Sequence, residues 1–231
     1  MSKQKESKKT LKNLLKRKAI REDVEAVGGV GLPSKMPGTA WGTSAKDCRV
    51  GGKLAQREGT VCHVCYAMKN NYVYPSVMGA HERRKEAASN DEAWIEAWCN
   101  ILAFLGNTLP DEERYHRWFD SGDLRDATQL DAIVQVAIRN PEWAFWLPSK
   151  EYGVVRKYAG EHGIPGNLAV RMSATVLGQD ATDAIKSITG LWSTVGYDEA
   201  DTCPAPDQEG ECGRCRACWD VLDTNKNYRQ H

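Results

Sequence analysis

The sequence predicts an α/β protein whose mainly parallel sheet forms a partial (βα) barrel. From residue 114 to residue 197, short runs that suit strands alternate with segments that suit helices. Strand–helix–strand units of this kind make right-handed crossovers between parallel strands. The chain has 231 residues, slightly fewer than a complete eight-fold barrel usually needs. We therefore expect an incomplete barrel of about four such units, preceded by one or two N-terminal ones.

The elements are expected in the following order along the chain. Residues 8–27 carry a loose helical pattern that ends near a Gly-Gly pair, and residues 28–59 are expected to form a loop because Gly, Ser, Lys and Pro are frequent there. Apolar residues then recur at intervals of three and four, which predicts helix over 74–106. Strands are expected at 114–120, 144–150, 167–175 and 191–197, and helices at 127–140, 151–163 and 180–190.

Composition divides the chain into three parts. Residues 1–27 form a basic N-terminal arm, residues 28–200 the partial barrel with its N-terminal cysteine motif, and residues 201–231 a cysteine-rich, metal-binding segment. The formal net charge is +0, yet residues 1–21 hold nine Lys or Arg against one Glu, which leaves an acidic body. A basic arm of this kind can bind nucleic acid through counterion release. It can equally be a solvated leader, or dock on its own acidic body.

The sequence carries no signal for a membrane or for secretion. No apolar run reaches the length of a transmembrane helix, and the N-terminus lacks the apolar stretch of a secretory signal. Hydrophobic residues make up 41% and charged residues 27%, as in ordinary soluble globular proteins. We expect a cytoplasmic protein with no membrane partner.

Polar residues follow four consecutive predicted strands. In parallel α/β sheets the chemistry sits at the carboxyl ends of the strands, so these residues predict a pocket there. Asp120, Asp123, Lys150 and Arg171 are the candidate catalytic residues, and Ser173 is a candidate for binding a cofactor. The whole set consists of Asp120, Ser121, Asp123, Ser149, Lys150, Arg171, Ser173, Ser193 and Thr194.

Four of the eight cysteines lie close together near the C-terminus: Cys203, Cys212, Cys215 and Cys218. Four thiolates within sixteen residues can close around one metal centre, and the Pro and Gly residues between them allow a tight fold. Structural zinc usually takes two C-x2-C pairs. A C-x2-C-x2-C run with a separate Cys-Pro is instead similar to the bacterial ferredoxin pattern. We favour a [4Fe–4S] cluster here, with zinc as the alternative.

A second group of cysteines lies near the N-terminus, with the spacing Cys48-x13-Cys62-x2-Cys65. Three thiolates on a cubane leave one iron open to an outside ligand such as S-adenosylmethionine (SAM). Zinc ranks second, and a redox dithiol ranks third because it would not need Cys48. Cys99 lies in an apolar helical stripe without a cysteine partner and is expected to be a small core residue.

Five short motifs occur in an order that resembles one known family. They are CHVCYA (62–67), SGDL (121–124), WLPSK (146–150), VRMSA (170–174) and CGRCRACW (212–219). Together they resemble the phage gene product 88 family, whose members are small bacteriophage proteins, over residues 36–219. The chain is also similar, more distantly, to radical-SAM-like phage proteins that carry a C-x-x-C-Y-A segment.

The wider kinship implies a partial (βα) barrel with an iron–sulfur cluster near its top, in the cytoplasm of the phage host. Cys48, Cys62 and Cys65 would stand where the radical SAM cluster ligands stand. Ser121, Gly122 and Asp123 would match the strand-end Gly-Gly-Glu that holds the SAM amino group. Radical SAM enzymes typically use C-x3-C-x2-C, whereas the first gap here is thirteen residues and an Asp replaces the Glu.

Three functions are compatible with these patterns. The first is an iron–sulfur enzyme of radical SAM type, with one or two [4Fe–4S] clusters, acting on a small molecule, nucleotide, nucleic acid or peptide held by Asp120, Lys150 and Arg171. The second is a non-catalytic protein, stabilised by iron–sulfur or zinc, that binds nucleic acid or a host protein through its basic arm. The third is hydrolysis with a divalent ion at Asp120 and Asp123.

Overall fold

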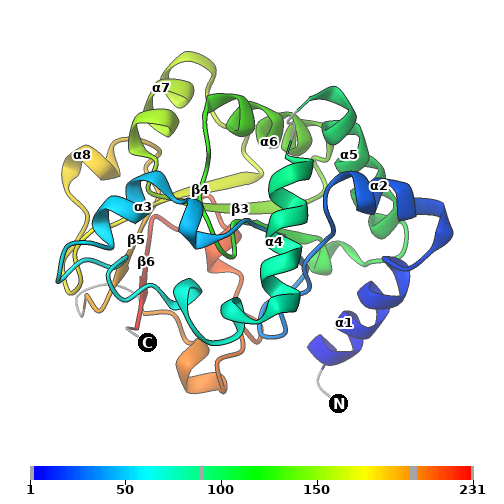
Figure 1. Ribbon diagram of the computed structural model, residues 1–231, viewed down its shortest axis with the longest axis horizontal. Coiled ribbons are helices and arrows are strands. Elements are labelled where there is room, and N and C mark those ends of the chain that lie inside the picture. Colours follow the sequence, from blue (N-terminus) through cyan, green and yellow to red (C-terminus); the bar gives the residue numbers. More distant parts are fainter. Residues whose placement is uncertain (1–2, 89–90, 198–201, 230–231) are drawn as a thin grey trace.

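A computed structural model describes residues 3–88, 91–197 and 202–229 (Figure 1). One six-stranded sheet runs through it, every neighbouring pair is parallel, and the strands follow one another in space in their chain order. Within the described residues, β1 and β6 form the two edges and do not pair with each other. The strands are β1 (Thr39–Trp41), β2 (Tyr115–Trp118), β3 (Ala144–Ser149), β4 (Leu168–Ser173), β5 (Trp192–Val195) and β6 (Asn225–Tyr228).

Helices connect the strands and cover one face of the sheet (Figure 1). The helices are α1 (Lys3–Leu14), α2 (Arg21–Ala26), α3 (Arg49–Leu54), α4 (Pro75–Ala87), α5 (Glu92–Gly106), α6 (Ala127–Arg139), α7 (Tyr152–His162) and α8 (Asp183–Lys186). Alternate strand residues such as Trp118, Phe145 and Val170 point at α5, α6 and α7 and form the main core with them. This sequential parallel order is what the alternating strand and helix pattern predicts.

The other face of the sheet carries a different set of side chains. Here Trp146 packs with Cys218 and Trp219 from the cysteine-rich segment, while Tyr115 and Tyr228 lie at the margin of this smaller cluster. Successive side chains along a strand point to opposite faces of the sheet, so alternate residues belong to the two clusters. The segment between β5 and β6 therefore lies against the face that the helices leave free.

The structure corrects several predicted elements. Residues 28–59, expected to be a loop, contain β1 and α3. The single helix expected over 8–27 is interrupted after Leu14, and the α-helical part of 180–190 is limited to α8. The last strand, β6, lies in the segment that composition marked only as metal-binding. Short strands such as β1, with three residues, give too little periodicity to be recognised.

The basic arm docks on the body of the protein. Leu11 on α1 is 0% exposed and belongs to the main core. Lys8 donates a hydrogen bond from Nζ to the Gly38 carbonyl at 2.5 Å, and Ser7 donates from Oγ to Glu113 at 2.5 Å. Burial lowers the pKa of Lys8 to about 8. In the described part of the chain, no helix is both long and apolar enough to span a membrane.

Candidate functional site

The three N-terminal cysteines lie around the start of α3 and the turn that follows it. Cys48 immediately precedes α3, while Cys62 and Cys65 come from the loop that leads to the next helical turn. A Cβ placed on Gly51 would lie 3.5 Å from the Cys62 Sγ and 3.7 Å from the Cys48 Sγ. Both sulfurs therefore face the same glycine, where a larger residue would fill the space between them.

Two strand ends of the sheet hold this cysteine loop in place. The buried carboxylate of Glu151, just after β3, accepts hydrogen bonds from the Val50 amide at 3.1 Å and from Arg49 Nη2 at 3.3 Å. On the other side, the Val61 amide donates to the Thr175 carbonyl, just after β4, at 2.9 Å. The trio (Cys48, Cys62 and Cys65) is thereby fixed at the carboxyl edge of the sheet, where the strand-end residues were expected to form a site.

Asp123 is the strand-end carboxylate beside the trio. Its Oδ1 accepts from Ser149 Oγ at 2.7 Å and from the Leu124 amide at 2.8 Å, and its Oδ2 accepts from the Lys150 amide at 2.8 Å. Burial outweighs these bonds and raises the pKa of Asp123 to about 6. A carboxylate has roughly four acceptor positions, so one remains for a further donor.

The thiols of the trio share one electrostatic environment with Asp123 and Lys150. Burial raises the pKa of Cys48, and the negative charges of Asp123 and of the other two cysteines add to the effect. Burial likewise raises the pKa of Cys62, while the ammonium of Lys150 opposes that rise. Without a cation, Cys48 and Cys62 are therefore held in the neutral form, and a bound metal would be needed to stabilise their thiolates.

The four C-terminal cysteines form a second group, of which Cys218 is buried and the other three are half-buried. Burial raises the pKa of Cys212 to about 12, and repulsion from Cys218, Cys203 and Cys215 contributes. Cys218 is 9% exposed, and its sulfur lies 3.2 Å from the Tyr228 hydroxyl. All four thiols of the quartet (Cys203, Cys212, Cys215 and Cys218) thus lie near one another, beside β6.

Arg171 holds the quartet segment against the sheet. This side chain is 0% exposed, in the middle of β4. Its guanidinium donates to the carbonyls of Ala217 at 2.7 Å, Asp220 at 2.8 Å, Cys218 at 3.1 Å and Thr224 at 3.4 Å. Arg171 was predicted to hold a substrate, but these four backbone acceptors give it a structural role instead.

A continuous set of contacts connects the trio with the quartet. Tyr66, the residue after Cys65, accepts a hydrogen bond from Arg117 Nη2 at 3.2 Å. The Arg117 guanidinium lies 4.2 Å from the centre of the Trp146 ring. Trp146 in turn lies 5.3 Å from the Trp219 ring, next to Cys218 in the chain. These contacts thus link the loop after Cys65, at the edge of the sheet, with Trp219 on the face of the sheet.

Asp120 lies in a different setting from Asp123, although only three residues separate them. Its carbonyl accepts hydrogen bonds from the Tyr66 hydroxyl at 2.9 Å and the Tyr72 hydroxyl at 3.2 Å. Its Oδ1 is buried and has no hydrogen-bond partner among the described residues. The guanidinium groups of Arg84 and Arg117 both interact electrostatically with the Asp120 carboxylate. The two aspartates therefore do not form the paired carboxylates that hydrolysis with a divalent ion would use.

The other residues predicted to bind a cofactor lie along the same edge. Ser121 is 3% exposed and its Oγ has no partner among the described residues. Gly122 has a φ of +80°, and a Cβ there would lie 2.4 Å from Thr43 Oγ1, so only glycine fits. Ser173, at the end of β4, accepts a hydrogen bond through its carbonyl from the Tyr152 hydroxyl at 2.5 Å.

The donor chemistry of both cysteine groups suits a thiophilic metal centre, but the described side chains do not form a closed single-ion site. Over residues 3–88, 91–197 and 202–229, no group of three or more His, Cys, Asp or Glu side chains is arranged to hold one metal ion. Four ligands of a single zinc ion lie close together, with each Zn–S distance about 2.3 Å. A cluster of four irons separates its cysteines more widely. The residue types therefore suit a metal centre, but the described side chains are not as close together as the ligands of a single zinc ion.

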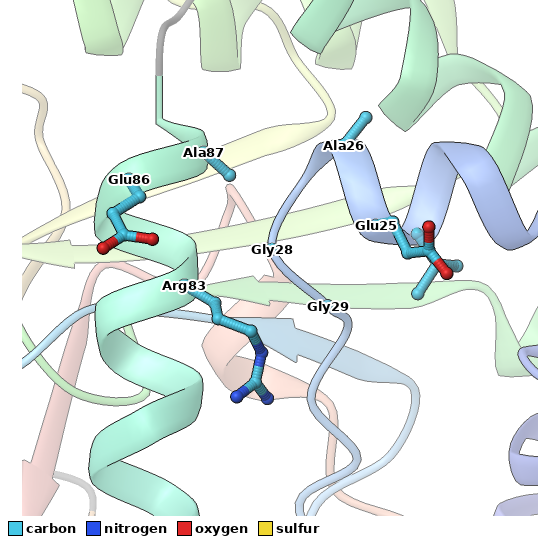
Figure 2. Close-up of a pocket in the computed structure, with 8 residues that line it drawn as sticks. Glu25, Ala26, Gly28, Gly29, Arg83, Glu86 and Ala87 are labelled. Carbon is cyan, nitrogen blue, oxygen red and sulfur yellow. The ribbon is translucent and has the colours of Figure 1, made fainter.

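A cavity lies elsewhere, between the end of α2 and α4. It measures 460 Å³ and is lined by the loop at Gly28 and Gly29 and by Arg83, Glu86 and Ala87 of α4 (Figure 2). The loop approaches α4 so closely that a Cβ on Gly28 would lie 2.5 Å from the Arg84 Cα. No residue predicted for the site lines this cavity.

Sequence reasoning missed three residues that position the site. Glu151 anchors α3, Arg117 joins the two cysteine groups, and Tyr66 fixes the loop after Cys65 on the end of β2. Glu151 directly follows the WLPSK motif, and Tyr66 lies inside CHVCYA, so their positions in or beside these motifs could have identified both residues. Arg117 gave no signal, because an isolated cation within a strand is usually exposed.

Comparison with known proteins gives one match. The chain matches the family described as Gene product 88 over residues 2–221. No curated protein and no solved structure matches it. The matched range includes both cysteine groups, the strand-end residues of β2 and β3 discussed above, and β1 to β5. The chain belongs to the Gene product 88 family.

Proposed function

We propose that this protein is an iron–sulfur protein and that the trio holds a [4Fe–4S] cluster at the carboxyl edge of the sheet. One observation carries the proposal. Cys48, Cys62 and Cys65 converge beside Asp123 and Lys150 at the carboxyl edge of a parallel sheet, where α/β proteins place their chemistry. Three thiolates would leave one iron open, and with SAM bound there the centre would supply one-electron chemistry of the radical SAM type.

The residues around the trio suit the binding of a ligand with an amino group. Asp123 has an acceptor position left after its three internal hydrogen bonds. Gly122 brings the backbone close, and Ser121 offers a buried hydroxyl. In this proposal Asp123 holds the ammonium of SAM, and Lys150 balances the negative charge of the thiolates. The substrate would lie on the open side of the trio, toward Asp120.

We further propose that the sheet is the wall of a partial (βα) barrel. The sequential order of its six parallel strands and the placement of α5, α6 and α7 on one face support this. The cysteine-rich segment would then fill the interior, where Trp146 and Arg171 meet it. This arrangement would leave the carboxyl end, with the trio, as the accessible mouth of the barrel.

The quartet supports a second, structural centre. Its four cysteines are drawn together in a segment that Arg171 ties to β4. Closed four-thiolate sites stabilise folds and leave no position for a substrate. We propose a second [4Fe–4S] cluster there, with zinc as the alternative metal. A protein with zinc at both sites would be a non-catalytic, metal-stabilised member of the family.

The test is to purify the protein without oxygen and to measure iron, sulfide, zinc and the visible spectrum. We expect absorbance near 400 nm and sulfide in proportion to iron. Cys62→Ser should remove the iron of the trio and Cys212→Ser that of the quartet, so each should lower the iron content by about half if the two centres are alike. Cys99→Ser is the matched control, because Cys99 packs against the main core and accepts a hydrogen bond from Asn140.

Two results would contradict this proposal. A colourless protein with zinc at both groups would overturn the iron–sulfur assignment. An iron protein whose reduced EPR signal does not change when SAM is added would retain the clusters but overturn SAM binding.

A further inference from the structure

Exposed hydrophobic side chains gather in one short segment directly after the CHVCYA motif. Seven large hydrophobic residues are exposed in the described chain, and five of them fall between residues 66 and 78. Large apolar side chains that collect on one part of a surface usually mark a binding site. We call this segment the aromatic strip; it contains Tyr66 (40% exposed), Met68, Val73, Tyr74 (56% exposed) and Met78.

Tyr66 of the strip is held in place by its hydroxyl although its ring faces solvent. The Tyr66 hydroxyl donates to the Asp120 carbonyl at 2.9 Å and accepts from Arg117 at 3.2 Å. Tyr72 donates to the same carbonyl at 3.2 Å, and its ring meets the Tyr66 ring edge-to-face at 5.6 Å. An exposed ring whose hydroxyl is fixed at the sheet offers a preorganised flat surface, which is the geometry for stacking another planar ring.

Basic residues are concentrated in the part of the sequence that contains the strip, in contrast to the rest of the body. Residues 46–85 contain eight Lys or Arg against three Asp or Glu, whereas residues 22–45 and 86–231 together contain 14 against 27. Four of these cations are exposed and form no ion pair within the described residues: Lys46, Lys53, Arg57 and Lys69. The turn that contains Lys46 packs against the turn that contains Tyr66. Cations and stacking rings therefore occur together around the trio.

We propose that this face binds single-stranded nucleic acid, with bases stacked on Tyr66 and Tyr74 and phosphates on the cations of residues 46–69. Stacking platforms beside a positive groove are the usual way to hold a single strand without reading its sequence. The inference rests on the proposed function in one respect: it makes a strand of nucleic acid the substrate beside the trio. It also moves the expected nucleic-acid contact away from the docked basic arm to residues 46–78.

The test is fluorescence anisotropy with labelled oligothymidylate and oligouridylate of about 16 nucleotides, at several salt concentrations. Tyr74→Ala should weaken binding about tenfold or more through lost stacking. Ile138→Ala is the matched control, because Ile138 is 54% exposed but lies on α6. Lys53→Ala should reduce the slope of log K against log salt by about 0.7, whereas Lys157→Ala on α7 should leave it unchanged.

Several outcomes would overturn the proposal. These are no binding at low salt, equally tight binding of a duplex of the same length, or loss of binding only when the Lys and Arg residues of 1–21 are neutralised. Self-association that Tyr74→Ala abolishes would assign the strip to a second copy of the chain. Iron, sulfide and zinc are measured on each sample. A protein that contains zinc and still binds the oligonucleotide would support nucleic-acid binding and overturn the proposed iron–sulfur chemistry.

Discussion

The two cysteine groups differ in how the fold holds them. The quartet lies under a buried arginine and beside Trp219, and a strand of the sheet, β6, follows it directly. The trio lies at the edge of the sheet and is fastened by one carboxylate and a few backbone contacts. Exposed rings follow the trio, whereas only Cys218 of the quartet is buried, in a cluster with Trp146 and Trp219. The two groups of the same residue type thus differ in their position on the sheet and in their anchoring contacts.

The largest effect should come from Arg171→Leu, which removes the connection that holds the quartet. Four carbonyls lose a charged donor in a buried setting, so the free energy of unfolding should fall by about 3–5 kcal/mol. The measurement is urea unfolding of the purified protein. Arg156→Leu is the control, because that exposed side chain makes one hydrogen bond to the Ala184 carbonyl. Equal stability of the two variants would show that the quartet is not held as we describe.

A smaller effect should follow from the raised pKa of Asp123. Since its folded pKa of about 6 exceeds the ordinary value of 3.8, folding favours the protonated form. The stabilisation from protonated Asp123 is therefore fully present below pH 4 and is lost as the pH rises through 6. The free energy of unfolding falls by up to about 3 kcal/mol over this range.

Asp123→Asn tests this contribution. Unfolding of both proteins is measured at pH 4.5 and pH 7, and the difference between the two pH values is compared. The fall in stability between these pH values should be smaller in the variant. His116, whose pKa burial lowers to about 3, is present in both proteins, so its effect cancels. An unchanged difference would place Asp123 in a better solvated environment than we describe.

The smallest effect should come from Glu151→Gln, which weakens the anchor of the trio without removing it. The amide can still accept from Val50 but loses its charge toward Arg49, so the free energy of unfolding should fall by about 1 kcal/mol. Cys48 should react faster with a thiol reagent, while the cysteines of the quartet should not. Faster reaction of both groups would mean that the two regions open together. Glu161→Gln, on the exposed face of α7, is the control.

Much of the sheet could be predicted from the sequence, because β2, β3, β4 and β5 alternate with helices of clear periodicity. β1 could not, since three residues carry too little pattern, and β6 could not, because its residues Asn225–Tyr228 include no run of apolar side chains. The strand-end location of Asp123 and Lys150 followed from the parallel topology alone. The role of Arg171 did not, because its four acceptors are backbone carbonyls from a segment more than forty residues away, which no local pattern reveals.

The sequential strand order also has a consequence for synthesis. Each new strand adds to the free edge of the sheet already made, so β1 to β5 can assemble while the chain is still emerging. The face that carries Trp146 and Arg171 stays uncovered until the cysteine-rich segment and β6 leave the ribosome. Until that moment the nascent protein exposes a tryptophan and an unpaired arginine on one side.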